Sequence, residues 1–188
     1  MKSADEHGLQ AGRLYDELLV TLVQAGDRQA TARLAARWQP RLARTARRLL
    51  LDDELAKGVV QDAWVSILRG LSSLREPSRF APWAFGILRR RCADAIRRLQ
   101  NDRRIDIDGD AEVSANDEIE DGISIRQALT MLPPGQRLAA QLFFVEGLSL
   151  AEIAEVQDVP LGTAKTRLFH ARRKLKAALS NDPQGDDT

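Results

Sequence analysis

The sequence of 188 residues predicts an all-α protein with two small helical domains joined by a flexible acidic linker. Apolar residues recur at spacings of three and four along most of the chain, and almost no segment alternates as a strand would. The segment 101–118 interrupts this pattern because it is polar, acidic and aperiodic. An amphipathic helix, a tight turn and a basic helix follow Gly147, which is typical of a helix-turn-helix. The domains are therefore expected over 9–100 and 119–180.

Four long helices are predicted in the first domain, over residues 9–24, 27–51, 53–71 and 79–100. Gly26 stops the first helix and Asp27 is the expected N-cap of the second, with a similar loop and cap at Asp52 and Asp53. Pro40 lies inside the second helix, where a bend is expected. A loop containing proline, residues 72–78, separates the third and fourth helices.

The third helix has a packing stripe, whereas its polar pair Gln61 and Asp62 falls off that stripe. The stripe consists of Leu55, Val59, Ala63, Ile67 and Leu71. In the fourth helix, Phe80, Trp83, Ile87 and Cys92 are expected to point inward beside a flank of arginines. Core packing is the default interpretation for all three tryptophans, since aromatic residues at helical spacing are usually buried. The polar loop before this helix is the better candidate for contacting bases.

Four shorter helices are predicted in the second domain, over residues 119–132, 135–146, 150–156 and 161–179. Pro133 and Pro134 end the first of these. Asp158 lies in the turn of the helix-turn-helix, where it tolerates a left-handed backbone better than most residues. Leu150, Ile153, Ala154 and Val156 are expected to support the last helix.

The last helix combines an apolar stripe with a uniformly cationic surface. The stripe is Leu161, Ala164, Leu168, Ala171, Leu175 and Ala178, and no acid occurs between residues 161 and 179. A polyanion is the expected partner. Pro160, Gly162 and Thr163 at its start could present N–H groups to a phosphate. The alternative is a basic, solvated helix hairpin in an ordinary bundle.

The formal net charge of +1 conceals an uneven distribution. Seven arginines and no acid lie between Arg28 and Arg48, whereas nine acids and two arginines lie between Asp102 and Asp121. Basic modules therefore flank an acidic connector. The single cysteine fits a reducing compartment, and no apolar run suggests a membrane span or a leader peptide, so a soluble cytoplasmic protein is expected.

Four blocks of sequence resemble bacterial sigma factors of the extracytoplasmic-function (ECF) group, which keep only conserved regions two and four. They are AGD at 25–27 before a basic helix, VQDAW at 60–64, FAPW at 80–83, and LPPGQR at 132–137 leading into PLGTAKTRL at 160–168. The resemblance covers about residues 10–180. The last block is the most specific, because its combination is far rarer than a helix-turn-helix alone.

The resemblance implies a subunit that binds core RNA polymerase, recognises two promoter elements in duplex and melted DNA, and assists DNA opening. Gln61 and Asp62 match the pair that docks on the clamp helices of the β′ subunit; the β subunit is a further expected partner. The loop before the fourth helix matches the segment that captures an extruded minus-ten base, with Ser73, Arg75 and Ser78 as candidates. The candidates for contacting minus-thirty-five DNA are Thr163, Lys165, Thr166, Arg167, Phe169, His170 and Arg173, with Thr163 and Arg167 assigned to phosphates.

The chain departs from the family pattern at two places. Lys57 and Gly58 replace a usual acidic pair before the docking block, and Gln157 and Asp158 replace a usual apolar residue and glycine in the turn. A sequestering anti-sigma protein is a family-level expectation. The sequence indicates no enzyme, no cofactor and no metal site. A helix-turn-helix regulator that binds duplex DNA alone is the alternative function, but it leaves the first domain unexplained.

Overall fold

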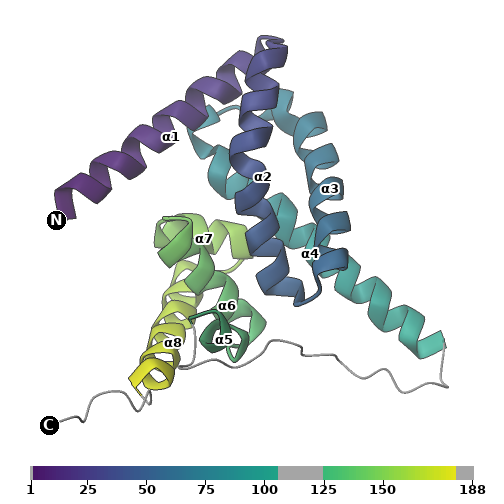
Figure 1. Cartoon of the computed structure of the whole chain (residues 1–188), viewed down its shortest axis with the longest axis vertical. Coiled ribbons are helices and arrows are strands. Elements are labelled where there is room, and N and C mark those ends of the chain that lie inside the picture. The colour runs from purple at the N-terminus through teal and green to yellow at the C-terminus, as the bar shows by residue number, and fades with distance from the viewer. Residues whose placement is uncertain (1, 106–124, 181–188) are drawn as a thin grey trace, which may run out of the picture.

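The computed structural model describes residues 2–105 and 125–180, and every regular element within these ranges is helical (Figure 1). The N-terminal domain consists of α1 (Lys2–Gln24), α2 (Arg28–Leu50), α3 (Asp53–Gly70), the 3₁₀ turns η1 (Leu71–Ser73) and η2 (Pro77–Arg79), and α4 (Phe80–Ile105). The C-terminal domain consists of α5 (Ile125–Thr130), α6 (Pro134–Ala140), the π-helix η3 (Gln141–Val145), α7 (Leu150–Gln157) and α8 (Leu161–Ser180). The predicted all-α fold with two domains is confirmed.

The helix starts in the N-terminal domain use the predicted caps. The Asp27 carboxylate accepts hydrogen bonds from the backbone N–H groups of Gln29 and Ala30, and that of Asp52 accepts one from Leu55. Gly26 has a φ of +91°, which a residue with a side chain rarely adopts. The α2 helix continues through Pro40 to Leu50.

Trp38 lies at the centre of the N-terminal core and is fully buried. Its ring meets that of Phe80 edge-on at a centroid distance of 4.8 Å, and Phe85 lies 5.6 Å away. The indole N–H donates to Asp16 Oδ1 at 3.0 Å, so a carboxylate of α1 satisfies the buried donor. Burial was predicted correctly for Trp38, whereas Trp64 and Trp83 are half-buried at the edge of the core.

The structure corrects the start of the predicted linker. The α4 helix continues to Ile105, so residues 101–105 are helical rather than part of a flexible connector. The sequence from Arg97 to Ile105 contains no glycine or proline that would end a helix. The rest of that linker, 106–118, and the first residues of the next predicted helix, 119–124, lie outside the described residues.

The two domains pack against each other through two pairs of helices, α7 on α4 and α6 on the end of α2 (Figure 1). One apolar cluster spans this junction. It includes Leu138, Leu142, Leu148 and Ile153 of the C-terminal domain together with the core of the N-terminal domain. A smaller cluster, formed by Leu129, Leu132, Ala140 and Ala171, holds α5 and α6 on α8. The basic helix α8 is thereby packed against the rest of the C-terminal domain, which in turn packs on the N-terminal domain.

Candidate nucleic-acid interface

The first helix of the helix-turn-helix, α7, begins with a capping box. The Ser149 hydroxyl accepts from the Glu152 N–H at 3.3 Å, and the Glu152 carboxylate accepts from the Ser149 N–H at 2.7 Å. Burial alone would raise the pKa of Glu152, but these hydrogen bonds from Ser149 and the nearby Arg13 guanidinium lower it overall. The carboxylate is therefore held ionised at the start of the helix.

The turn between α7 and α8 has the backbone conformation expected for it. Asp158 has a φ of 53°, and its N–H donates to the carbonyl groups of Ala154 and Glu155. The chain then enters α8 after Pro160, whose carbonyl accepts from the N–H groups of Thr163 and Ala164. Asp158 thus replaces the more common glycine without loss of the turn.

The predicted apolar stripe of α8 is largely correct. Ala164, Leu168 and Ala171 are buried, and Leu175 and Ala178 are half-buried. Leu161 is the exception, since it is 55% exposed. It occupies the first position of α8, which packs against α5, α6 and α7. The same holds on α7, where Ile153, Ala154 and Val156 are buried and Leu150 is half-buried.

The outward face of α8 presents most of the residues proposed for DNA contact. Thr163, Lys165, Thr166, Phe169 and Arg173 are exposed, and His170 is half-buried with its ring centroid 5.5 Å from that of Phe169. The Thr166 hydroxyl donates to the Gly162 carbonyl at 2.9 Å. Within the described part of the chain, no ion pair neutralises a cation of this helix. The side chains free of ion pairs there are Lys165, Arg167, Arg172, Arg173, Lys174 and Lys176.

Arg167 differs from its neighbours because it contacts the protein. Its Nη1 donates to Gln157 Oε1 at 2.6 Å, and Gln157 Nε2 donates to the Gly135 carbonyl at 2.9 Å. A β-carbon at Gly135 would lie 3.2 Å from the guanidinium carbon of Arg167. This chain of contacts ties α6, α7 and α8 together, and the sequence suggested only the phosphate role for Arg167.

Arg137 of the LPPGQR block also serves the fold. Its guanidinium is buried and donates to the carbonyl groups of Leu129, Thr130 and Leu132 at 2.6–3.0 Å, at the end of α5. A fourth bond, 3.1 Å long, reaches the Arg48 carbonyl at the end of α2. Burial lowers the pKa of this guanidinium. A positive charge at the ends of two helices also complements their dipoles.

The loop between α3 and α4 carries Ser73, Arg75 and Ser78, all of which are exposed. Leu71 and Phe80 anchor its two ends in the core. Gln24, which the sequence analysis did not single out, donates from Nε2 to the carbonyl groups of Leu71 and Leu74 at 2.9 and 2.8 Å. The loop is thus fixed on α1 with its polar side chains outward.

Gln61 and Asp62 lie on the exposed side of α3, as their position off the apolar stripe predicts. Val65 and Leu68, on the same helix, are 46% and 48% exposed. This α3 surface, defined by Gln61, Asp62, Val65 and Leu68, combines polar and apolar groups. It belongs to the N-terminal domain and lies apart from the outward face of α8.

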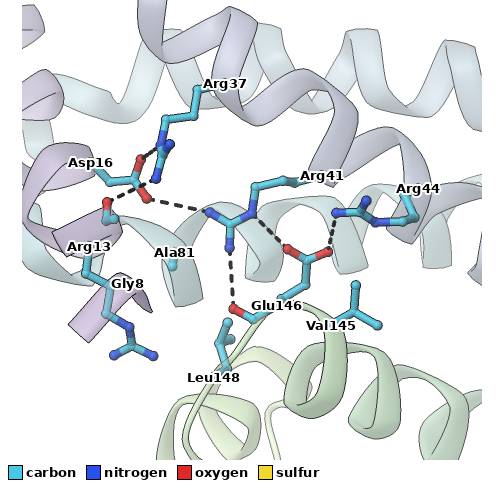
Figure 2. Close-up of a pocket in the computed structure, with 11 residues that line it drawn as sticks. Gly8, Arg13, Asp16, Arg37, Arg41, Arg44, Ala81, Val145, Glu146 and Leu148 are labelled. Atoms are coloured by element: carbon cyan, nitrogen blue, oxygen red, sulfur yellow. Dashed lines mark hydrogen bonds and ion pairs between the residues drawn. The ribbon is translucent and has the colours of Figure 1, made fainter. Parts of the chain in front are cut away.

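The junction between the domains contains a cluster of charged residues that the sequence did not identify. Figure 2 shows Arg41 of α2 between Asp16 of α1 and Glu146, which directly follows η3. Its Nε lies 2.8 Å from Glu146 Oε2, and its Nη1 lies 3.5 Å from Asp16 Oδ2. These groups border a cavity of about 270 Å³. The spacing of Arg37, Arg41, Arg44 and Arg48 along one stripe of α2 was the available signal.

Other kinds of site are absent from the part of the chain that the structure describes. Residues 2–105 and 125–180 contain no group of three or more His, Cys, Asp or Glu side chains arranged to hold a metal ion. In the same ranges, no helix has the length and apolar character needed to cross a membrane.

Comparison with known proteins gives two family matches. The Sigma-70 region 2 model matches residues 34–102, and the Sigma-70, region 4 model matches residues 123–175. RNA polymerase sigma-H factor of Pseudomonas aeruginosa is 30% identical, covering 87% of this chain and 93% of the relative. ECF RNA polymerase sigma factor SigM of Mycobacterium tuberculosis is 33% identical over 87% of this chain and 83% of its own length.

Two solved structures are similar to this chain over most of its length. CnrH in complex with the cytosolic domain of CnrY is 26% identical, with a TM-score of 0.64 over 89% of this chain and 99% of the other. RpoE of Bartonella quintana in complex with the anti-sigma factor NepR is 25% identical, with a TM-score of 0.69 over 81% of this chain and 98% of the other.

We expect Ser149→Ala to lower the free energy of unfolding by about 1 kcal/mol, because an N-cap bond and half of the capping box are lost. Thermal unfolding followed by circular dichroism measures the change. Ser72→Ala, a serine to alanine change at an exposed position of η1, is the control. Equal stability of the two variants would show that the box contributes nothing to the domain.

The same box makes stability depend on pH. The folded-state pKa of Glu152 is lowered. The ionised carboxylate therefore contributes to the free energy of unfolding above the unfolded-state pKa, and this contribution is lost as pH falls through the folded-state pKa. The stability difference between the wild-type protein and Glu152→Gln should therefore shrink in acid. A stability difference that stays constant from neutral pH down through the folded-state pKa of Glu152 would contradict a stabilising role for the ionised carboxylate.

Proposed function

The chain belongs to the extracytoplasmic-function group of the sigma-70 family, and from this premise we propose how its surfaces direct RNA polymerase to promoters. Residues 9–100 form the domain that docks on core polymerase and reads the melted minus-ten element. Residues 119–180 form the domain that reads the minus-thirty-five element, and, since α4 continues to Ile105, only 106–118 of the predicted linker connects the two domains. The exposed, unpaired cationic face of α8 is the observation that carries the proposal.

The minus-thirty-five contacts divide between bases and phosphates. Lys165, Thr166, Phe169 and His170 are assigned to base edges in the major groove, where an α-helix fits and where donors and methyl groups distinguish the base pairs. Arg173 extends the same face by one turn. Thr163 at the start of the helix is assigned to a phosphate. Arg167 is also assigned to a phosphate. It would contact the phosphate through the guanidinium N–H groups that do not bond to Gln157.

The minus-ten contacts are assigned to Ser73, Arg75 and Ser78. A base that leaves the stack exposes its hydrogen-bonding edge. Unstacking costs a few kcal/mol, roughly, and contacts between the protein and the extruded base offset this cost. Gln24 holds this loop in one conformation, so little ordering entropy is lost on binding. The exposure of all three side chains supports the assignment.

The docking surface for core polymerase is assigned to Gln61 and Asp62 on α3, facing the clamp helices of the β′ subunit. The exposed Val65 and Leu68 beside them supply apolar area of the kind found at the centre of protein interfaces. The β subunit is the second polymerase contact. An anti-sigma protein is a further proposed partner, in line with the NepR complex of RpoE. The cytoplasm is the proposed location, and the proposed activity is binding rather than enzymatic catalysis.

Reconstitution tests the function as a whole. Purified chain added to core RNA polymerase should give run-off transcripts from specific genomic promoters, whereas core polymerase alone should give none. Tight duplex binding by the chain alone, combined with failure of transcription at every promoter tried, would favour the stand-alone regulator instead.

Lys165→Ala should weaken use of promoters with a minus-thirty-five element by about 1–3 kcal/mol, and His170→Ala should change which base is preferred there. Competitive transcription from a promoter library measures both. Lys176→Ala, an exposed cation farther along α8, should instead lower binding equally for all sequences. Unchanged promoter choice in the first two variants would remove this face from the interface.

The double variant Gln61→Ala, Asp62→Ala should lower the affinity for core polymerase without altering the helical content of the chain, because both side chains are exposed. Fluorescence anisotropy with labelled chain measures the affinity. Asp94→Asn, which removes an exposed pair with Arg97 on α4, is the matched control. Equal affinity of the double variant and the control would move the docking surface elsewhere.

A further inference from the structure

A cavity of about 270 Å³ lies between α1, α2 and the segment that follows η3 (Figure 2). Its volume is close to the lower end of the range for small-molecule sites, which is about 300 Å³. The charged residues that line it are Arg13, Arg37, Arg41, Arg44, Asp16 and Glu146. The cavity therefore has the size and the polarity of a site for a small charged molecule.

The carboxylates of the cavity are more deeply buried than its outer guanidinium groups. The side chains of Asp16 and Glu146 are 10% and 1% exposed, whereas those of Arg37 and Arg44 are 38% and 43% exposed. Arg41 lies between the two acids, with Nε toward Glu146 and Nη1 toward Asp16. The buried acids thus orient the arginines from the inner side and leave the outer guanidinium groups accessible.

Arg37 and Arg44 keep hydrogen-bond donors for a ligand. Within residues 2–105 and 125–180, Arg37 donates through Nε to Asp16 and through Nη2 to the Gly12 carbonyl. Arg44 donates there only through Nη2, at 3.4 Å to Glu146. Because a guanidinium has N–H groups on all three nitrogens, Nη1 of Arg37 and both Nε and Nη1 of Arg44 are available. Ion pairing within the protein accounts for Arg41 but not for these outer donors.

The cavity also has an excess of positive charge. Its four guanidinium groups meet three carboxylates, because Asp16 and Glu146 pair with arginines of α2, and Glu152 pairs with Arg13. The positive charge that remains is on the accessible arginines. An anion is therefore the expected ligand.

The spacing of the arginines indicates an anion with two charged groups. Arg37 and Arg44 lie on one side of α2 with Arg41 between them (Figure 2). Their seven-residue separation corresponds to about 10 Å along the helix, at about 1.5 Å per residue. One phosphate is short for this span, whereas a diphosphate presents oxygens to a guanidinium at each end. The N–H fork of arginine matches the geometry of such phosphate oxygens.

Two glycines of α1, Gly8 and Gly12, form part of the cavity wall. A β-carbon at Gly8 would meet no atom within 4 Å, so packing does not require glycine there. A β-carbon at Gly12 would lie 3.0 Å from Arg37 Nη2, so the bare backbone leaves room for that guanidinium. Glycine within a helix is destabilising relative to alanine. The two glycines thus weaken α1 and leave space in the cavity.

We propose that this cavity binds a small metabolite that contains a diphosphate group. Arg37 and Arg44 bind the two ends of the diphosphate, and Arg41, held by Asp16 and Glu146, supplies positive charge between them. The surfaces assigned to promoter DNA and to core polymerase contain none of these residues. The diphosphate site therefore does not depend on the proposed function.

Isothermal titration calorimetry with inorganic pyrophosphate and the full-length chain tests the site, without divalent cations and at about 0.15 M salt, where exposed charges are screened. One pyrophosphate should bind per chain. Arg44→Gln and Arg37→Gln should each weaken binding about tenfold or more, because charge-assisted hydrogen bonds are lost. Both side chains are partly exposed, so folding should be retained, which circular dichroism checks.

Arg33→Gln is the matched control, since it removes an exposed arginine of the same helix that does not line the cavity. Lys174→Gln removes an exposed cation of α8 in the same way. Both controls should bind pyrophosphate as the wild type does. Equal weakening in the controls and in Arg44→Gln would show that the anion responds to net charge alone, which overturns the proposal. Wild-type binding of pyrophosphate that is no tighter than that of inorganic phosphate would also overturn it.

Adenosine diphosphate distinguishes a nucleotide ligand from a free diphosphate. Ala81, Val145 and Leu148 supply apolar surface beside the arginines, where the organic part of a nucleotide could pack. Tighter binding of adenosine diphosphate than of pyrophosphate would assign the site to a nucleoside diphosphate, and the reverse order to free diphosphate. Either order supports the site when Arg44→Gln weakens the tighter ligand. Equal affinities of the wild type and Arg44→Gln for both ligands would overturn the proposal.

Discussion

Both domains depend on the position of one guanidinium, that of Arg41. It stacks on Trp38 at the centre of the N-terminal core, pairs with Asp16 of α1, and pairs with Glu146 of the C-terminal domain. Removal of Arg41 would leave the Glu146 carboxylate, which is 1% exposed, with Arg44 as its cationic partner, and Asp16 with Arg37. Packing of α1 on α2 and contact between the two domains are therefore coupled through one side chain.

The sequence predicted the parts of the structure that local rules determine. Asp27 and Asp52 cap their helices as predicted, and Trp38 is buried at the position that helical spacing indicates. The outward face of α8 was also predictable, because a 20-residue helix with one apolar stripe has one possible exposed side. Leu161 is the one residue of that stripe that is exposed. It is the first residue of α8, where the periodic pattern no longer predicts burial.

Long-range pairing of charges was not predictable from the sequence. The arginines of α2 have the pattern of a surface for nucleic acid, but Arg37, Arg41 and Arg44 pair with Asp16 and Glu146, at separations of 21 to 105 residues. No local rule identifies such partners. The π-helix η3 is a second example, because the Glu146 N–H bonds to the Gln141 carbonyl five residues earlier, and this wider turn precedes the acid that α2 binds. The basic residues thus divide into two functional groups that look alike in the sequence.

These two groups explain how a chain with a net charge of +1 can bind a polyanion. Ion pairs across the junction join cations of the N-terminal domain to Glu146, Glu152 and Glu155, whereas the cations of α8 have no acid on their own helix. Arg79 directly follows Ser78, one of the residues proposed for minus-ten contact, and its pair with Glu155 joins the two domains at that point. The positive charge left for a polyanion is therefore concentrated on α8, whose cations form no ion pair within the described residues.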